Sequence, residues 1–189
     1  MYKYFMILFL FYRYLIIIYN KYLIIDYNYM KKKIKAICLI QGKCDGSIEL
    51  EEYGKKRVRT HVLLSKLEPF SFHAIHIHET GDLRKGCLSL KAHYNPHNKT
   101  HGGPNDKNRH VGDLGNIYFD KKGEAKYSFQ DDYIKLRGTK ANIIGRSVVI
   151  HADRDDLGLG GHKDSLTTGH AGARITCAVI GYSKKMFHK

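Results

Sequence analysis

The sequence has no C-x-x-C pair, and this absence excludes the commonest cysteine-based sites. Its four cysteines in 189 residues are Cys38, Cys44, Cys87 and Cys177. Zinc ribbons and thioredoxin-like redox centres both need two cysteines separated by two residues, so neither is supported. Cys38 lies in an apolar run and is expected to be a buried small hydrophobe, and Cys44 is expected to be a free thiol in a turn. Cys87 and Cys177 could close a long loop, but their spacing alone does not show that they pair.

Acidic residues are also scarce. Lys and Arg number 32 against 18 Asp and Glu, which leaves a formal net charge of +14. Such a surplus suits a nucleic-acid surface, a membrane surface or a field that attracts a small anion. The basic residues are spread along the whole chain, whereas the 12 histidines cluster with the glycines. This dispersion favours a solvated surface over a single nucleic-acid groove.

The first 29 residues contain neither glycine nor proline and only one acidic residue, Asp26. The apolar span 4–25 is long enough to cross a bilayer, but Arg13 near its middle would cost about 2.5 to 3.5 kcal/mol there. A signal peptide would need a small-residue cleavage site, and none follows. If Met30 is the true start, the preceding residues are a translated leader. We therefore expect an N-terminal extension, residues 1–29, that is a leader, an anchor or a signal, followed by one domain, residues 30–189.

From residue 30 onward the sequence lacks both a convincing helical stripe and any alternation of strands with helices. Short strand-like runs remain, bounded by glycine, proline or polar residues. They cover residues 35–40, 47–52, 58–65, 72–78, 116–119, 126–129, 146–151 and 174–181. Eight such strands predict an all-β fold, an antiparallel sandwich or barrel. Two long loops, 81–112 and 152–172, interrupt it, and loops of that length inside a compact domain usually have a function.

Histidines gather between His76 and Asp113. His76 and His78 form an H-x-H pair on a predicted strand, and alternation along a strand points both imidazoles to the same side. The glycine-rich loop that follows can fold back over this pair. The candidate ligands are His76, His78, His93, His101, His110, Asp113 and, at the end of a later apolar strand, His151.

Seven ligands are too many for one tetrahedral site. Two metals that share one ligand would use them all, with four nitrogens suiting copper and three nitrogens plus a carboxylate suiting zinc. An imidazole can bridge two ions because it has two ring nitrogens. Asp155 is a candidate acceptor that would set the tautomer of ligating histidines. We interpret His61, His73, His97, His162, His170 and His188 as non-ligands.

The motifs resemble those of the copper-zinc superoxide dismutase family. The resemblance covers roughly residues 35–182 and rests on specific runs: His76-Ile77-His78-Glu79, Gly86-Cys87, His93-Tyr94-Asn95-Pro96, His101-Gly102-Gly103-Pro104, Arg109 to Asn116, His151, Asp155 to Gly158, and Gly172-Ala173-Arg174. It implies an eight-stranded antiparallel Greek-key β-barrel, an immunoglobulin-like sandwich, with two long functional loops. Residues before Met30 have no counterpart in the family's basic domain.

Position by position, the resemblance implies the site. Copper would be held by His76, His78, His93 and His151. Zinc would be held by His93, His101, His110 and Asp113, with His93 as the bridge. Asp155 would link His76 to His101 through their second nitrogens. Cys87 and Cys177 would form the family's intrasubunit disulfide, and Arg174 would hold the anionic substrate beside copper.

The implied activity is the dismutation of superoxide to dioxygen and hydrogen peroxide. Copper would alternate between two oxidation states, zinc would stay structural, and His93 would hand a proton to the product. The resemblance further implies a homodimer in the cytoplasm, loaded by a copper chaperone, with no nucleic-acid partner. A membrane or secreted location would follow only from a genuine targeting segment in residues 1–29. An inactive homologue that sequesters or delivers copper is the alternative.

Several positions depart from the family pattern. Lys91 stands where the family commonly has a glycine, two residues before the bridge, in the loop that should hydrogen-bond Arg174. Lys163, Asp164 and Thr167 change the charge arrangement of the second long loop. Thr80 replaces a residue that is often aromatic at the dimer contact, although Ile144-Gly145 and the region near Tyr182 still resemble that contact.

Overall fold

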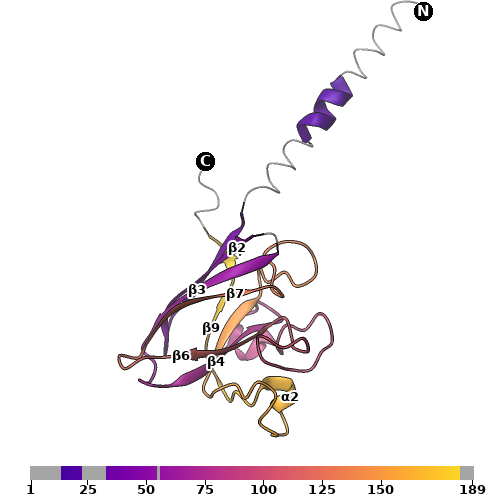
Figure 1. The fold of residues 1–189 in the computed structure, drawn as a ribbon. Coiled ribbons are helices and arrows are strands. Elements are labelled where there is room, and N and C mark those ends of the chain that lie inside the picture. The colour runs from indigo at the N-terminus through magenta and orange to yellow at the C-terminus, as the bar shows by residue number, and fades with distance from the viewer. Residues whose placement is uncertain (1–13, 23–32, 55, 184–189) are drawn as a thin grey trace, which may run out of the picture. The chain divides into compact units, whose positions relative to one another are not determined.

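The computed structural model describes residues 14–22, 33–54 and 56–183. The chain divides into two compact units, Met1–Lys33 and Ile34–Lys189. In the first, residues 14–22 are helical (Figure 1), and all their large apolar side chains except that of Ile18 are exposed. None of the helices among the described residues is long and apolar enough to cross a membrane. Most of residues 1–29, to which the leader, anchor and signal interpretations apply, lies outside the described ranges.

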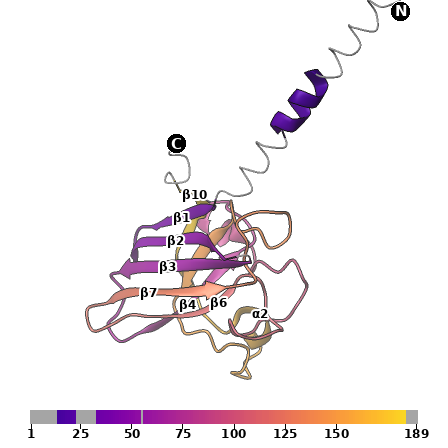
Figure 2. The ribbon, with the colours of Figure 1, turned by 45° about the horizontal axis from the view of Figure 1, so that its top comes forward.

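The second unit consists of two antiparallel sheets (Figures 1 and 2). One has the strand order β10-β1-β2-β3-β7 and the other β6-β4-β8-β9. The strands of the first sheet are β1 (Lys35–Ile40), β2 (Asp45–Tyr53), β3 (Arg57–Ser65), β7 (Glu124–Asp131) and β10 (Gly181–Tyr182). Those of the second are β4 (Phe72–His78), β6 (Asp113–Tyr118), β8 (Ser147–His151) and β9 (Arg174–Val179).

The all-β prediction is confirmed, and the bounds of β1 and β4 agree with it residue for residue. Among the described residues the strands form two separate sheets, so the barrel is not closed. Of the two predicted forms, sandwich and barrel, the fold is therefore the sandwich. Three short elements within the long loops were not predicted: β5 (Arg84–Cys87), the 3-10 helix η1 (Leu88–Leu90) and α2 (Ser165–Thr168).

The core lies between the two sheets, and alternation explains which residues enter it. In β1 the side chains of Ala36, Cys38 and Ile40 are buried, whereas Leu39 is exposed. The strands β4 and β8 are different, since nearly every side chain in them is buried. Ile75, Ile77, Val148 and Ile150 face the core, whereas Val149, which pairs with His76, lies on the other face, which the loops cover. This second, covered face is where His76 and His78 lie.

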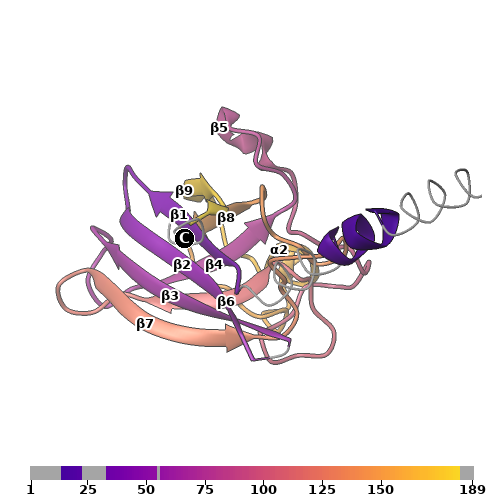
Figure 3. The same ribbon diagram turned by 90° about the horizontal axis from the view of Figure 1, so that it is seen from above.

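A disulfide joins the first long loop to the second sheet. Cys87, at the end of β5, bonds to Cys177 in β9, with the two Cα atoms 5.8 Å apart. The pairing that the resemblance implied is thus confirmed, and Cys38 and Cys44 are free and buried. Figure 3 shows β5 on the opposite side of the sandwich from β7. The disulfide therefore attaches the first long loop, which is not part of either main sheet, to β9 of the second sheet.

Candidate metal centre

The strands β4 and β8 supply three histidines to one buried space. His76 and His78 point away from the core, and His151 ends β8 after an irregularity in its pairing with β9. His76 is fully buried, and His78 and His151 are nearly so. The ring centroids of His76 and His151 are 4.9 Å apart. Alternation on one strand and the end of its neighbour thus bring three imidazoles together.

The first long loop returns to β4 and adds the remaining ligands. His93 forms an isolated bridge with His78, and Tyr94 N–H donates to the Ile77 carbonyl at 2.8 Å. Ile77 N–H donates to the Gly112 carbonyl, also at 2.8 Å. A Cβ at Gly112 would lie 2.1 Å from the Ile77 oxygen, so only glycine allows this approach. The loop is therefore bonded to the strand between its two histidines.

One half of the centre is built around a carboxylate. Asp113 Oδ1 lies 2.9 Å from His93 Nδ1, 3.0 Å from His101 Nδ1 and 3.1 Å from His110 Nδ1. Ligands about 2.0 to 2.1 Å from a tetrahedral zinc are separated from each other by roughly 3.3 Å. The other oxygen of Asp113 accepts the backbone N–H groups of Gly102 and His110. Burial alone would raise the pKa of Asp113, but the three imidazoles that surround the carboxylate hold it well below its usual range.

The other half contains only imidazoles. His78 Nδ1 bonds to the Lys91 carbonyl at 2.8 Å and His151 Nδ1 to the Gly172 carbonyl at 3.3 Å. Their Nε2 atoms consequently face each other, 3.4 Å apart. Burial is the main cause that lowers the pKa of His78 to about 3 and that of His151 to about 4. Both rings are therefore neutral at ordinary pH and can act as metal ligands.

Three buried ring nitrogens show whether the two halves of the centre suit metal ions. Among the described residues, His76 Nδ1, His93 Nε2 and His101 Nδ1 have no hydrogen-bond partner. His101 Nδ1 lies close to Asp113, but the direction of the contact is wrong for a hydrogen bond. A buried polar atom left without a partner costs roughly 1 to 3 kcal/mol. Coordination would satisfy all three nitrogens, so the residues fit metal ions.

Asp155 connects the two halves. Its carboxylate accepts from His76 Nε2 and from His101 Nε2, both at 2.8 Å. These bonds leave Nδ1 of each ring as the lone-pair atom. They also outweigh the effect of burial and lower the pKa of Asp155 to about 2. Gly169 packs on this link, since a Cβ there would meet Asp155 Oδ1 at 2.1 Å.

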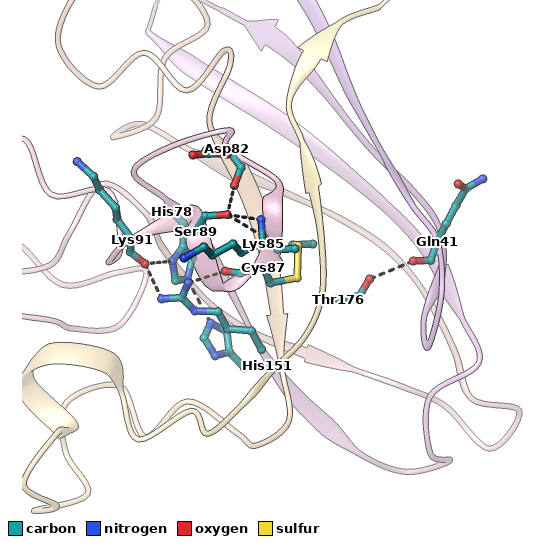
Figure 4. Close-up of a disulfide and its surroundings, with 12 residues drawn as sticks. Gln41, His78, Asp82, Lys85, Cys87, Ser89, Lys91, His151 and Thr176 are labelled. Atoms are coloured by element: carbon teal, nitrogen blue, oxygen red, sulfur yellow. Dashed lines mark hydrogen bonds between the residues drawn. A yellow bond between two sulfur atoms is a disulfide. The ribbon is translucent and has the colours of Figure 1, made fainter.

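Arg174 lies beside the imidazole half. It begins β9, paired with His151, and its Nη1 donates to the Cys87 carbonyl at 2.6 Å. Its Nη2 donates to the Lys91 carbonyl. Figure 4 shows this part of the site, with the Lys91 and Cys87 carbonyls as hydrogen-bond acceptors. The disulfide loop thus holds a cation at the edge of the centre.

All the residues predicted from the sequence for this site lie together. By distance the ligand atoms form two groups, one with His76, His93, His101 and Asp113 and one with His78, His93 and His151. His93 belongs to both. His76 falls in the first group by distance, whereas the sequence prediction places it with copper, and its ring lies 4.0 Å from that of His93. His110 joins through Asp113.

The histidines predicted as non-ligands lie outside both groups, in so far as the structure describes them. His73 bonds to the His151 carbonyl and to Ser71 Oγ, at 2.9 and 3.0 Å. His61, His97, His162 and His170 are exposed, and His188 lies outside the described ranges.

One supporting residue was missed. The buried guanidinium of Arg109 donates to the Asp113 carbonyl at 2.7 Å and pairs with Asp131, while its plane lies over the ring of Tyr133. Arg109 thereby ties a zinc-type ligand to the end of β7. No local signal could reveal this, because Asp131 is 22 residues away in the chain.

Comparison with known proteins identifies the family. Residues 44–180 match the model of the family described as "Copper/zinc superoxide dismutase (SODC)". The chain belongs to the copper/zinc superoxide dismutase family. This membership establishes the reaction, dismutation of superoxide to dioxygen and hydrogen peroxide, and the cofactors, copper and zinc.

Several relatives of this superoxide dismutase agree with the assignment. The chain is 56% identical over 156 residues, 82% of each chain, to a superoxide dismutase [Cu-Zn] of Paramecium bursaria Chlorella virus 1. It is 45% identical to that of Cordyceps militaris over 78% of this chain and 97% of the relative. It is 52% identical to an extracellular superoxide dismutase [Cu-Zn] of Haemonchus contortus over 72% of this chain and 73% of the relative. None of these names favours the alternative of an inactive homologue.

A solved structure agrees at the level of the fold. The crystal structure of the clock protein EA4 superimposes with a TM-score of 0.78 at 42% identity. The match covers 81% of this superoxide dismutase and 97% of the solved chain. The two chains therefore share the same overall fold.

Proposed function

We propose that His76, His78, His93 and His151 hold copper, and that His93, His101, His110 and Asp113 hold zinc. The observation that carries this assignment is the set of three buried ring nitrogens that have no hydrogen-bond partner among the described residues, on histidines whose ligand atoms lie within 4.8 Å of those of the other group members. Three nitrogens and one carboxylate oxygen suit zinc, and a set of nitrogens alone suits copper. His93 is common to both groups and is the proposed bridge.

The second nitrogen of each ring supports this assignment. Asp155 accepts from Nε2 of His76 and His101, so these two rings offer Nδ1. Backbone carbonyls accept from Nδ1 of His78 and His151, so these two offer Nε2. In each case the hydrogen bond selects the tautomer and fixes the ring plane. The protein therefore directs four lone pairs before any ion arrives.

Copper, when bound, supplies the one-electron chemistry that oxidises one superoxide and reduces the next. Arg174 is proposed to bind the anion. Two of its five N–H groups are used by the carbonyls of Cys87 and Lys91, and the rest remain for the substrate. Its fixed positive charge also attracts superoxide into the site. His93 is proposed to take up a proton at Nε2 and to pass it to the reduced product.

Metal analysis combined with a superoxide decay assay tests this function. The wild-type protein should bind both metals and accelerate decay. His93→Ala should lose the bridge and most activity, and Arg174→Ala should keep both metals but lose activity. His97→Ala is the matched control, since His97 is an exposed histidine of the same loop. A wild-type protein that holds both metals and leaves superoxide decay unchanged would contradict the proposal.

We propose further that residues 30–189 form the enzymatic domain, that it works as a homodimer, and that a copper chaperone loads it. Support for the dimer comes from Ile144-Gly145 and the region near Tyr182, which resemble the family's contact, although Thr80 departs from it. Light scattering of the purified protein tests the dimer: a monomeric mass would contradict it.

We propose a cytoplasmic location, with secretion or anchoring only if residues 1–29 are a targeting segment. One relative is named extracellular, and this keeps secretion as the outcome to test. N-terminal sequencing of the native protein, combined with cell fractionation, distinguishes Met1 from Met30 and the compartments from each other.

A further inference from the structure

Lys91 has a backbone conformation that ordinarily requires glycine. Its φ is 63° and its ψ is −152°. This part of backbone space is almost restricted to glycine, because a Cβ is crowded there. A lysine persists in it only if the surroundings hold it in place. The conformation therefore calls for a restraint on this residue.

The Lys91 carbonyl accepts two hydrogen bonds from residues of the site. It accepts from His78 Nδ1 at 2.8 Å and from Arg174 Nη2. His78 is a proposed copper ligand and Arg174 the proposed anion site, so the position of one oxygen atom affects both. A rotation of this peptide would tilt the imidazole and release the guanidinium together.

The Lys91 side chain is held from the neighbouring segment. Its Nζ lies 3.1 Å from Glu79 Oε1. The two residues face each other across a short backbone pairing, in which Glu79 N–H donates to the Ala92 carbonyl at 3.0 Å and Thr80 N–H to the Leu90 carbonyl at 3.3 Å. Opposite charges in such cross-strand positions attract. Figure 4 shows the Lys91 side chain extending away from His78 and His151, while its carbonyl faces His78.

Glu79 is itself well anchored. Besides its N–H bond to Ala92, its carbonyl accepts from Arg146 Nη1, and the Arg146 guanidinium lies over the ring of Tyr94, 3.4 Å from the centroid. Since Glu79 directly follows His78, it moves with the strand that carries the ligand. The backbone of Glu79 is thus held in place, and its carboxylate extends from this fixed backbone toward the lysine.

We propose that the Lys91–Glu79 ion pair is a positioning device for the copper side of the site: it holds the Lys91 peptide in its glycine-type conformation, and through the Lys91 carbonyl it orients His78 and Arg174. The proposal rests on the proposed roles of His78 and Arg174. Lys91 acts through these two residues and touches neither substrate nor metal.

Hydrogen exchange of single ring protons tests the proposal directly. In the protein loaded with zinc and reduced copper, NMR can follow solvent exchange of the His78 Nδ1 proton, which is bonded to Lys91. The Nε2 protons of His76 and His101, which are bonded to Asp155, serve as internal references in the same molecule. This readout needs no turnover, so a failed positioning role and a failed dismutase function are distinguishable.

Four substitutions separate the ion pair from the backbone requirement. Lys91→Ala removes the pair and keeps the crowded Cβ, so His78 exchange should become about two- to fivefold faster, the range for an exposed ion pair. Glu79→Gln should have the same effect. Lys91→Arg keeps the pair, and Lys91→Gly removes the need for it, so both should exchange as the wild type does. Lys85→Ala, which removes an exposed lysine from the same loop, is the control for charge.

A second probe follows Arg174. The dissociation constant of azide, measured on the oxidised copper form, should rise in Lys91→Ala by a similar factor and stay near the wild-type value in Lys91→Gly. In the Lys91→Gly background, Glu79→Gln should have no further effect on either probe. Wild-type exchange in both Lys91→Ala and Glu79→Gln, or equally fast exchange in Lys91→Gly and Lys91→Ala, would overturn the proposal.

Discussion

The two halves of the metal centre share His93 but are built on different principles. The half formed by His101, His110 and Asp113, here called the carboxylate side, has a buried negative charge at its centre. The half formed by His78 and His151, here called the imidazole side, has none. Both are buried under the same loops, so the difference between them is one of charge and not of solvent access.

This difference appears in the protonation of the rings. Burial would lower the pKa of His101, but the nearby carboxylates of Asp113 and Asp155 outweigh it and raise the pKa to about 9. On the imidazole side burial prevails, and the pKa values of His78 and His151 fall to about 3 and about 4. The carboxylate side thus accepts a positive charge even without metal, whereas the imidazole side excludes protons.

The supports differ as well. Side chains hold the carboxylate side, namely Asp155 against His101 and Arg109 against the Asp113 carbonyl. Backbone carbonyls of Lys91 and Gly172 hold the imidazole side, next to Arg174. A site whose charge is balanced by a buried carboxylate suits a structural ion, and a site beside the positively charged side chain of Arg174 suits an anionic substrate. We therefore expect the carboxylate side to hold a structural ion and the imidazole side to carry out the chemistry.

Removing the Asp113 carboxylate should have the largest effect, because it abolishes the charge that distinguishes the carboxylate side from the imidazole side. Asp113→Ala leaves three buried imidazoles without their shared acceptor, so we expect near-complete loss of zinc and a free energy of unfolding lower by about 3 to 5 kcal/mol. Metal analysis and denaturant unfolding measure both. Asp132→Ala, an exposed aspartate nearby, is the control. Unchanged zinc content in Asp113→Ala would contradict the carboxylate-centred description.

The disulfide should matter mainly to the imidazole side. Cys177→Ser opens a link across 90 residues and should lower the free energy of unfolding by about 2 to 5 kcal/mol. It also frees the loop that carries the Cys87 and Lys91 carbonyls, so anion affinity should fall while zinc is retained. Azide titration and zinc analysis of the same sample check this. Cys44→Ser, at a free buried cysteine, is the matched control, and loss of zinc equal to the loss of anion affinity would argue against the division.

Asp155 joins the two sides, so its replacement should weaken both. Asp155→Asn cannot accept equally from His76 and His101, and we expect metal affinity lower by about 10- to 100-fold. Competition with a chelator, measured separately for copper and zinc, gives the two factors. A decrease for zinc alone would show that the link serves only the carboxylate side.

In the metal-free protein, acid should lower the stability through the imidazole side of the centre, and alkali should lower it through the carboxylate side. The folded-state pKa values of His78 and His151 lie below the ordinary 6.5, so the unfolded chain binds more protons and stability falls as pH drops from about 6.5 toward 4. The pKa of His101 is raised to about 9, so its contribution is present below 6.5 and lost as pH rises through 9.

Each change should reach at least about 1.4 kcal/mol, the equivalent of one pKa unit. Denaturant midpoints from pH 4 to 10 test it in the metal-free protein. His78→Gln should flatten the acid limb and Asp155→Asn the alkaline limb. If the two variants showed the same dependence of stability on pH, the two sides of the centre would not differ in their electrostatics as described.

Much of this centre was predictable because its ligands follow local rules. Alternation on one strand already placed His76 and His78 on one side, and the motifs around His93, His101 and Asp113 carried the family resemblance. Arg109 was missed as a support because its partner, Asp131, is close only in the folded chain. The short elements β5, η1 and α2 were missed because three or four residues within a loop carry no periodic signal.

By itself, the sequence determined the strand pattern and the types of the candidate ligands, since these depend on residue chemistry and short-range spacing. Only the tertiary structure decided that the sheets form an open sandwich, that Cys87 meets Cys177, and that one carboxylate lies between three imidazoles. It also decided the conformation of Lys91. These features depend on distances between segments far apart in the chain, and packing of the whole domain sets those distances.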